Sequence, residues 1–245
     1  MHTAVTTAII PREPVWLTGI AGESVSRRGG RSINADAAAT YTDSTVGRTA
    51  FAVADGVGDH LLAARAARTV ANIAARVGAR SGAVAGILAA QQKLLHEFPQ
   101  EGADSVLVIA VLETDQPKGP CDIAWVGDCR AYRWNGRVLH QITTDHTVAE
   151  HFRASGLHAA PRLNHLVTTS ARTVRPAAVG HTATGSSRGR LLLSTDGVHK
   201  CLEMTDIKAI LAGGATAGIA AEALVDNALR SGGTDNATAF VVDAG

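Results

Sequence analysis

The sequence of 245 residues predicts an α+β fold built on mostly antiparallel sheets. Two observations support this class. Short runs of β-branched and aromatic residues follow one another at a spacing of roughly ten residues in the middle of the chain, and the predicted helices come in adjacent pairs instead of alternating with strands. No internal repeat or long linker interrupts the pattern. We therefore expect an extended lead-in over residues 1–14 and a single domain over residues 15–245.

The first half of the chain is expected to contain three strands followed by two helices. The strands are residues 15–21, 37–41 and 49–55, which are apolar runs bounded by polar turns. The next segments are Ala-rich with apolar positions at helical spacing, which predicts helices over residues 61–77 and 83–98. We expect the glycine-containing segment 78–82 to separate these helices and Pro99 to end the second one.

The sequence of the second half predicts further strands, three helices and one irregular region. Asn135-Gly136 is typical of a two-residue hairpin turn, and Thr144 and Gly156 are suited to begin and end a helix over residues 144–155. Residues 157–190 are polar and weakly periodic, so they form either a loop-rich, flap-like region or a pair of poorly marked strands. The other strands are expected at residues 105–112, 121–126, 131–134, 138–142, 191–195 and 238–242, and the other helices at 205–211 and 216–229.

Composition narrows the classes of function. The net charge is only +1, so no basic excess is present to hold a nucleic acid by its phosphates. The 3 cysteines form no CxxC pair, which argues against a disulfide framework or a zinc ribbon. The first residues lack the pattern of a signal peptide, and the longest apolar run is too short to cross a bilayer. We expect a cytoplasmic protein with neither a nucleic-acid nor a membrane partner.

Four aspartates on short signatures are the strongest chemical signal: Asp36, Asp55, Asp196 and Asp235. Three of the four end an apolar run, which places a carboxylate at the end of a predicted strand. If several such strand ends converge, their carboxylates form an oxygen-rich pocket suited to a hard cation such as Mg²⁺ or Mn²⁺. Each aspartate taken singly is equally well explained as a helix cap or a turn residue.

The order of six short motifs adds to this signal. The matching residues are Arg31, Asn34 and Asp36; Asp55, Gly56, Gly58 and His60; Gly127, Asp128 and Arg130; Thr143, Asp145 and His146; Asp196 and Gly197; and Asp235, Asn236 and Thr238. With these residues the chain resembles the metal-dependent serine/threonine protein phosphatases (the PPM, or type 2C, family) in their compact bacterial form. The resemblance implies a four-layer α/β/β/α sandwich with a binuclear metal centre at one edge.

The resemblance also implies a role for each motif residue. The residue matching Asp55 bridges both ions in the family, and the one matching Gly56 offers its backbone carbonyl. Those matching Asp196 and Asp235 hold one of the two ions. By the same resemblance, Asp55 is expected to act in catalysis as well as in metal binding.

Three further roles follow from the same resemblance. The residue matching Asp36 reaches the metal cluster directly or through water. The one matching Asp128 contributes to a third and weaker metal site. The arginine matching Arg31 binds the substrate phosphate, which suits a guanidinium because it offers two parallel donors.

The expected function is therefore metal-dependent hydrolysis of phosphoserine and phosphothreonine in proteins, with two or three Mn²⁺ or Mg²⁺ ions. Expected partners are phosphorylated protein substrates and a cognate serine/threonine kinase of a bacterial signalling pathway, and we expect a monomer. Two alternatives remain open: a narrower substrate, a phosphorylated anti-sigma-factor antagonist, or a phosphatase-like binding or scaffold domain without turnover.

Some positions depart from the family pattern. Cys129 stands where the family commonly has serine, and Asp104 lies in a segment where the family commonly has Gly-Thr-Thr. Val57 occupies the position of a histidine proposed as the general acid in animal members. The leaving-group acid is therefore unassigned, with a water on a metal ion as the default, and the role of Asp104 is open.

Overall fold

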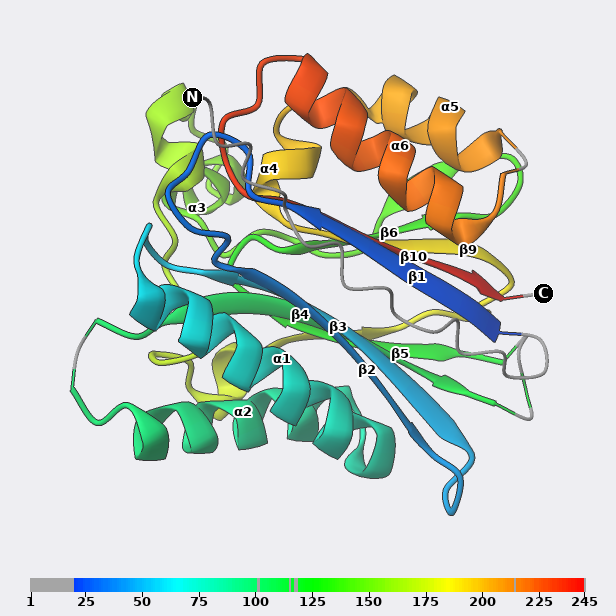
Figure 1. The fold of residues 1–245 in the computed structure, drawn as a ribbon, viewed down its shortest axis with the longest axis horizontal. Coiled ribbons are helices and arrows are strands. Elements are labelled where there is room, and N and C mark those ends of the chain that lie inside the picture. The colour runs from blue at the N-terminus through cyan, green and yellow to red at the C-terminus, as the bar shows by residue number, and fades with distance from the viewer. Residues whose placement is uncertain (1–19, 101, 115, 117–118, 214, 245) are drawn as a thin grey trace, which may run out of the picture.

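The computed structural model describes residues 20–100, 102–114, 116, 119–213 and 215–244. Two five-stranded antiparallel sheets stack face to face, and helices cover the outer face of each (Figure 1). The α/β/β/α sandwich expected from the resemblance is thus confirmed. The expected lead-in over residues 1–14 and most of the expected strand 15–21 lie outside the described residues.

The first sheet lies between the second sheet and the helix pair α1 and α2. Its strand order is β2-β3-β4-β5-β8. The strands are β2 (Asp36–Asp43), β3 (Arg48–Gly56), β4 (Ser105–Glu113), β5 (Cys121–Val126) and β8 (Gly180–Ala183), and the helices are α1 (Leu61–Ser81) and α2 (Ala83–Glu97).

The second sheet has the strand order β1-β10-β9-β6-β7, and α5 and α6 cover its outer face (Figure 1). Its strands are β1 (Ile20–Arg27), β10 (Ala237–Ala244), β9 (Gly189–Ser194), β6 (Arg130–Trp134) and β7 (Leu139–Gln141). The remaining elements are α3 (Val148–Ala154), α4 (Asp196–His199), α5 (Met204–Ala212), α6 (Ala217–Arg230) and the short 3₁₀ helices η1 (Pro161–His165) and η2 (Pro176–Ala178).

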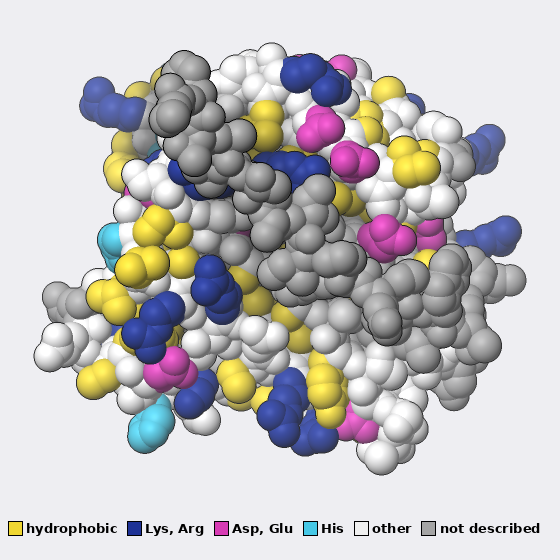
Figure 2. Space-filling view, in the orientation of Figure 1, with side chains coloured by type: hydrophobic (Ala, Val, Ile, Leu, Met, Phe, Trp, Pro, Cys, Tyr) yellow, Lys and Arg dark blue, Asp and Glu magenta, His cyan; other side chains and the backbone are white. Residues whose placement is uncertain are grey.

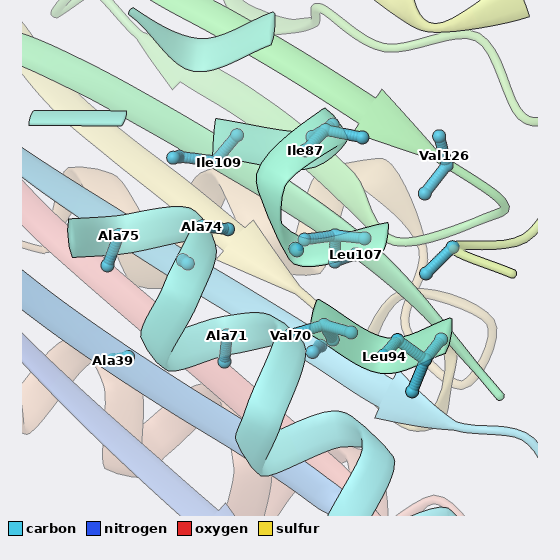
Figure 3. Packing of buried hydrophobic residues seen from close by; sticks show 14 of the residues in the cluster. Ala39, Val70, Ala71, Ala74, Ala75, Ile87, Leu94, Leu107, Ile109 and Val126 are labelled. Carbon is cyan, nitrogen blue, oxygen red and sulfur yellow. The ribbon is translucent and has the colours of Figure 1, made fainter. Parts of the chain in front are cut away.

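Strand β3 separates two hydrophobic layers. Its alternate residues Ala50, Ala52 and Ala54 pack with α1 and α2, whereas Phe51 and Val53 pack between the sheets. Helix α1 presents a row of buried alanines, which keeps it close to the strands, and Figure 3 shows this contact with residues of α2 and of the sheet. Since the central strands are buried on both faces, they appear in the sequence as continuous apolar runs.

The helix boundaries differ from the prediction at two places. Helix α1 continues through Gly78 to Ser81. Gly78 therefore does not end the helix. Its role is in packing, because a Cβ at this position would lie 2.4 Å from the Ile109 side chain. The break comes at Gly82, whose φ of +94 favours glycine. Helix α3 begins at Val148 instead of Thr144, and its cap is Thr147, which accepts a hydrogen bond from the Glu150 N–H.

Three connections also differ from the prediction. The link between β6 and β7 has four residues, 135–138, because Trp134 pairs with Leu139, so the expected two-residue turn is wrong. Strand β1 runs on to Arg27 because it pairs with β10 along its whole length. The region 157–190 is neither of the two expected alternatives alone. It contains η1, η2, the strand β8, which completes the first sheet beside β5, and the first two residues of β9.

None of the helices in the described part of the chain is long and apolar enough to span a bilayer. On the face shown in Figure 2, basic and acidic side chains are interspersed, in keeping with the net charge of +1.

Candidate active site at the ends of the two sheets

The predicted aspartates come from strand ends that meet at one edge of the sandwich. Asp36 begins β2 and lies directly opposite Asp55, near the end of β3. Asp196 follows β9 by two positions, and Asp235 precedes β10 by two positions. Since β9 and β10 are antiparallel neighbours, the end of one lies beside the start of the other. The four aspartates, far apart in the sequence, are therefore brought to one edge of the fold.

A pocket of about 210 Å³ opens at this edge. Six of the seven predicted site residues line it, and Asp36 does not. Seven further residues line it, and three of them have polar side chains that sequence reasoning did not assign to a site: Asp59, His165 and Asn236. The full lining is Arg31, Asp55, Gly56, Val57, Gly58, Asp59, Val106, Asp128, His165, Val167, Asp196, Asp235 and Asn236.

Asp36 is buried and ties the two sheets together. Its Oδ2 accepts hydrogen bonds from the hydroxyl groups of Thr195, at 2.8 Å, and Thr238, at 2.7 Å. Thr238 lies in β10 of the second sheet, and Thr195 directly follows β9 of the same sheet. Its Oδ1 has no hydrogen-bond partner within the described chain. Burial raises the pKa of Asp36 to about 7, against the lowering effect of the two threonine hydroxyls.

Asp55 has a still more unfavourable environment for a negative charge. Removal from water, followed by the charges of Asp36 and Asp196, raises the pKa of Asp55 well above its ordinary value. Next to it, a Cβ at Gly56 would lie 2.4 Å from the carbonyl oxygen of Ala63. A glycine is therefore required for the backbone to pass between the pocket and α1.

Two cationic side chains compensate part of this negative charge. Arg31 donates from Nη2 to Asp235 Oδ2 at 2.7 Å. The Lys200 ammonium donates to Asp128 Oδ2 at 2.7 Å and to Asp196 Oδ2 at 2.9 Å. Among the described residues, no three His, Cys, Asp or Glu side chains form a group that could hold a metal ion in this conformation.

The loop that carries Arg31 is fixed by two side chains. Both carboxylate oxygens of Asp59 accept hydrogen bonds from the backbone, from Ser32 N–H and Ile33 N–H at 3.0 Å each. Asn236 is buried and makes three bonds to the same loop. Its Oδ1 accepts from the Ala35 N–H, and its Nδ2 donates to the carbonyl oxygens of Arg28 and Ile33. Asn236 thus links the loop that carries Arg31 to the segment that carries Asp235 by hydrogen bonds.

The motifs around Asp128 and Asp145 also fold together. Arg130 forms a two-pronged ion pair with Asp145, with Nε–Oδ1 at 2.8 Å and Nη2–Oδ2 at 2.7 Å. The His146 N–H donates to the carbonyl oxygen of Gly127 at 2.9 Å. These bonds hold the β5–β6 turn that presents Asp128, so Arg130 and Asp145 have a structural role. His60 likewise caps α1, where its Nδ1 accepts from the Ala63 N–H.

The structure explains Asp104, which the sequence did not. Its Oδ2 accepts a hydrogen bond from the Ser170 hydroxyl at 2.6 Å, and its Oδ1 accepts from the Arg172 N–H at 3.0 Å. Arg172 in turn donates to the carbonyl oxygens of Phe98 and Ala103. Asp104 therefore anchors the second part of the 157–190 region against the start of β4.

Sequence reasoning also missed Lys200, which pairs with two of the lining carboxylates, and His165, which lines the pocket. Lys200 follows Asp196 by four positions, the spacing of side-chain neighbours on a helix, and that spacing could have suggested the ion pair. His165 lies in the weakly periodic region, where the sequence offers no comparable signal. Its Nδ1 lies 3.9 Å from Asp196 Oδ2.

Comparisons with known proteins identify the fold. No protein-family model and no curated protein matches the chain. Solved structures do. The serine/threonine phosphatase Stp1 from Staphylococcus aureus superposes with a TM-score of 0.78 at 22% identity, over 98% of this chain and 100% of that one. The chain has the fold of the bacterial PPM-type serine/threonine phosphatases.

Two further structures with the PPM fold carry relevant ligands. The PPM Ser-Thr phosphatase MsPP from Mycobacterium smegmatis, solved in complex with cacodylate, has a TM-score of 0.72 at 25% identity, over 91% of this chain and 98% of that one. The catalytic domain of the phosphatase PstP, solved with 2 manganese ions, has a TM-score of 0.71 at 24% identity, over 91% and 97% of the two chains.

The chemistry of the pocket fits divalent cations. Four carboxylates, those of Asp55, Asp128, Asp196 and Asp235, face one cavity, and such oxygen donors suit Mg²⁺ and Mn²⁺. Burial and the neighbouring carboxylates raise the pKa of Asp55, and a cation in the pocket would favour its charged form. The arrangement can therefore accept cations once the Asp235 carboxylate, now paired with Arg31, turns toward them.

Proposed function

We propose that this chain is a metal-dependent protein phosphatase that hydrolyses phosphoserine and phosphothreonine. The observation that carries the proposal is the convergence of Arg31 with four carboxylates in one pocket of a PPM-type fold. A cluster of carboxylates alone would be a metal site. The guanidinium adds a group that binds phosphate oxygens in pairs, so the same pocket suits both a divalent cation and a phosphoryl group.

In the proposed centre, the carboxylates of Asp55, Asp196 and Asp235 and the Gly56 carbonyl would hold the ions. Bound Mn²⁺ or Mg²⁺ would lower the pKa of a water at the centre and neutralise charge on the phosphoryl group. Asp36 lies opposite Asp55 on the neighbouring strand, and its unpartnered Oδ1 would reach the centre directly or through a water.

Arg31 would orient the substrate. In the described conformation its Nη2 is paired with Asp235, and its side chain is 43% exposed, so it remains accessible from the pocket mouth. Once Asp235 binds a cation, the guanidinium is released to bind two phosphoryl oxygens. Asp59 and Asn236 would keep the Arg31 loop at a fixed distance from the carboxylates throughout.

The wider setting belongs to the same proposal. We expect phosphorylated proteins as substrates, a serine/threonine kinase as the opposing enzyme in a bacterial signalling pathway, the cytoplasm as the compartment, and a monomer. Support comes from the phosphatases with the same fold and from the two manganese ions bound to PstP.

The direct test is release of phosphate from a phosphothreonine peptide, with and without Mn²⁺. We expect activity only with the metal. Asp55→Asn should lower it by roughly 100-fold or more, because removal of groups that act together in a site has effects of this order. Asp206→Asn, on the outer helix α5, is the matched control and should remain active. Absence of metal-dependent release would favour the scaffold alternative.

A further inference from the structure

Lys200 is the C-cap residue of α4, and its ammonium uses all three of its donors. They go to Asp128 Oδ2 at 2.7 Å, to Asp196 Oδ2 at 2.9 Å and to the carbonyl oxygen of Asn164 at 3.0 Å. The side chain is only 16% exposed. This is not the geometry of a surface ion pair, because the ammonium is enclosed by three oxygen acceptors from three separate parts of the chain.

The two carboxylates that Lys200 joins both face the pocket described above. Asp128 lies on the β5–β6 turn and Asp196 at the end of β9, so they converge only in the tertiary structure. Two oxygens close enough to share one ammonium are also close enough to share one metal ion. Lys200 thus occupies the position that a cation between Asp128 and Asp196 would take.

The electrostatics of the site keep the lysine charged. Desolvation lowers the pKa of Lys200, but the charges of Asp196 and Asp128 outweigh this and raise it above its ordinary value. A divalent ion placed between the same two oxygens would be in direct contact with the ammonium, and like charges at that distance repel strongly. The lysine and a metal ion therefore exclude one another at this position.

We propose that the Lys200 ammonium serves as a built-in third cation between Asp128 and Asp196, so that the chain binds two divalent ions and not three. The inference rests on the proposed binuclear centre and deepens it. Asp128 then acts as the partner of Lys200 and is not a metal ligand, which changes the role expected from the sequence.

A second consequence concerns the 157–190 region. The same ammonium binds the Asn164 carbonyl, next to His165, which lines the pocket. A cation that is covalently part of the chain cannot dissociate, so it holds η1 against the pocket whatever the metal concentration. In this way Lys200 positions the region as well as offsetting part of the charge of the two carboxylates.

The test is to count Mn²⁺ ions per chain by equilibrium dialysis followed by elemental analysis, up to millimolar Mn²⁺. We expect two ions for the wild type and two for Asp128→Asn. Lys200→Ala should bind a third ion, because two carboxylates are then left without a counter-charge. The double variant Lys200→Ala/Asp128→Asn should return to two. The matched control Lys93→Ala removes a lysine paired with Glu97 on α2 and should leave the count at two.

The outcomes separate this inference from the proposed function. A wild-type count of three, a count of two in Lys200→Ala, or a lower count in Asp128→Asn would each overturn the role of Lys200 while leaving the binuclear centre standing. A wild-type count below two would remove the centre and this inference with it. Circular dichroism of each variant verifies that it is folded, and the Lys93→Ala control shows whether loss of a lysine as such alters metal binding.

Discussion

Asp36 and Asp55 lie directly opposite each other on the antiparallel strands β2 and β3. Carboxylates in this position repel each other, and like charges opposite on neighbouring strands destabilise a sheet. Both have a raised pKa in the folded protein. In the metal-free protein, burial and charge repulsion therefore disfavour the ionised carboxylates at the edge where we propose that cations bind.

The first prediction concerns pH. The pKa of Asp36 rises from 3.8 to about 7 on folding, so the folded state holds a proton over this interval that the unfolded state has lost. Stability of the metal-free protein should consequently fall as pH rises through this window. One pKa unit corresponds to about 1.4 kcal/mol, so the total effect amounts to several kcal/mol.

Thermal melts in EDTA at pH 5 and pH 8 check this, with Asp36→Asn as the variant. We expect the wild type to melt at a lower temperature at pH 8 than at pH 5, and the variant to depend less on pH, because its amide does not titrate. Addition of Mn²⁺ at pH 8 should raise the wild-type melting temperature. An equal pH dependence in both proteins would contradict the assignment.

The second prediction concerns Asn236, whose buried amide makes three hydrogen bonds to the Arg31 loop. Asn236→Ala leaves one N–H and two carbonyl groups without their partner. The expected loss is about 2–4 kcal/mol of unfolding free energy, or roughly 5–10 °C in melting temperature for a chain of this size. Asn72→Ala, which removes a single exposed bond within α1, should change it little. Similar losses of unfolding free energy in both variants would show that the Asn236 hydrogen bonds do not stabilise the fold.

The third prediction concerns Asp59, which accepts the Ser32 and Ile33 N–H groups and so fixes the loop beside Arg31. In Asp59→Ala the loop loses these bonds, and Arg31 should bind phosphate less well. We expect KM for a phosphopeptide to rise by roughly 10-fold, with a smaller change in kcat, because one or two hydrogen bonds are lost. Steady-state kinetics check this, with Asp206→Ala as the control. An unchanged KM would count against positioning by Asp59.

The fourth prediction concerns the leaving-group acid. Among the described residues that line the pocket, His165 carries the only imidazole. If it donates the proton, His165→Ala should lower kcat for a phosphoserine peptide by roughly 100-fold. Hydrolysis of p-nitrophenyl phosphate, whose leaving group needs no proton, should change little.

His158→Ala is the matched control for this experiment, because His158 lies on the same segment and does not line the pocket. It should behave like the wild type with both substrates. Equal losses on the two substrates in His165→Ala would assign the proton to another donor, such as water.

Much of the fold could be predicted because its signals are local. The central strands are buried on both faces and therefore form continuous apolar runs, so β3, β4 and β10 were expected within a few residues of their observed bounds. Helix α3 was placed too early because Asp145 is drawn into its ion pair with Arg130. Nothing local in the sequence reports a partner 15 residues away.

The sequence by itself determined which residues carry the candidate chemistry, because motif order and residue type survive without coordinates. It specified Arg31, Asp55, Asp196 and Asp235. Only the tertiary structure decided how they are used, since contacts between distant segments depend on sheet register and on helix packing. It placed Asp36 behind the pocket on two threonine hydroxyls. It also brought Lys200 between Asp128 and Asp196, where one ammonium bonds to two carboxylates that lie far apart in the chain.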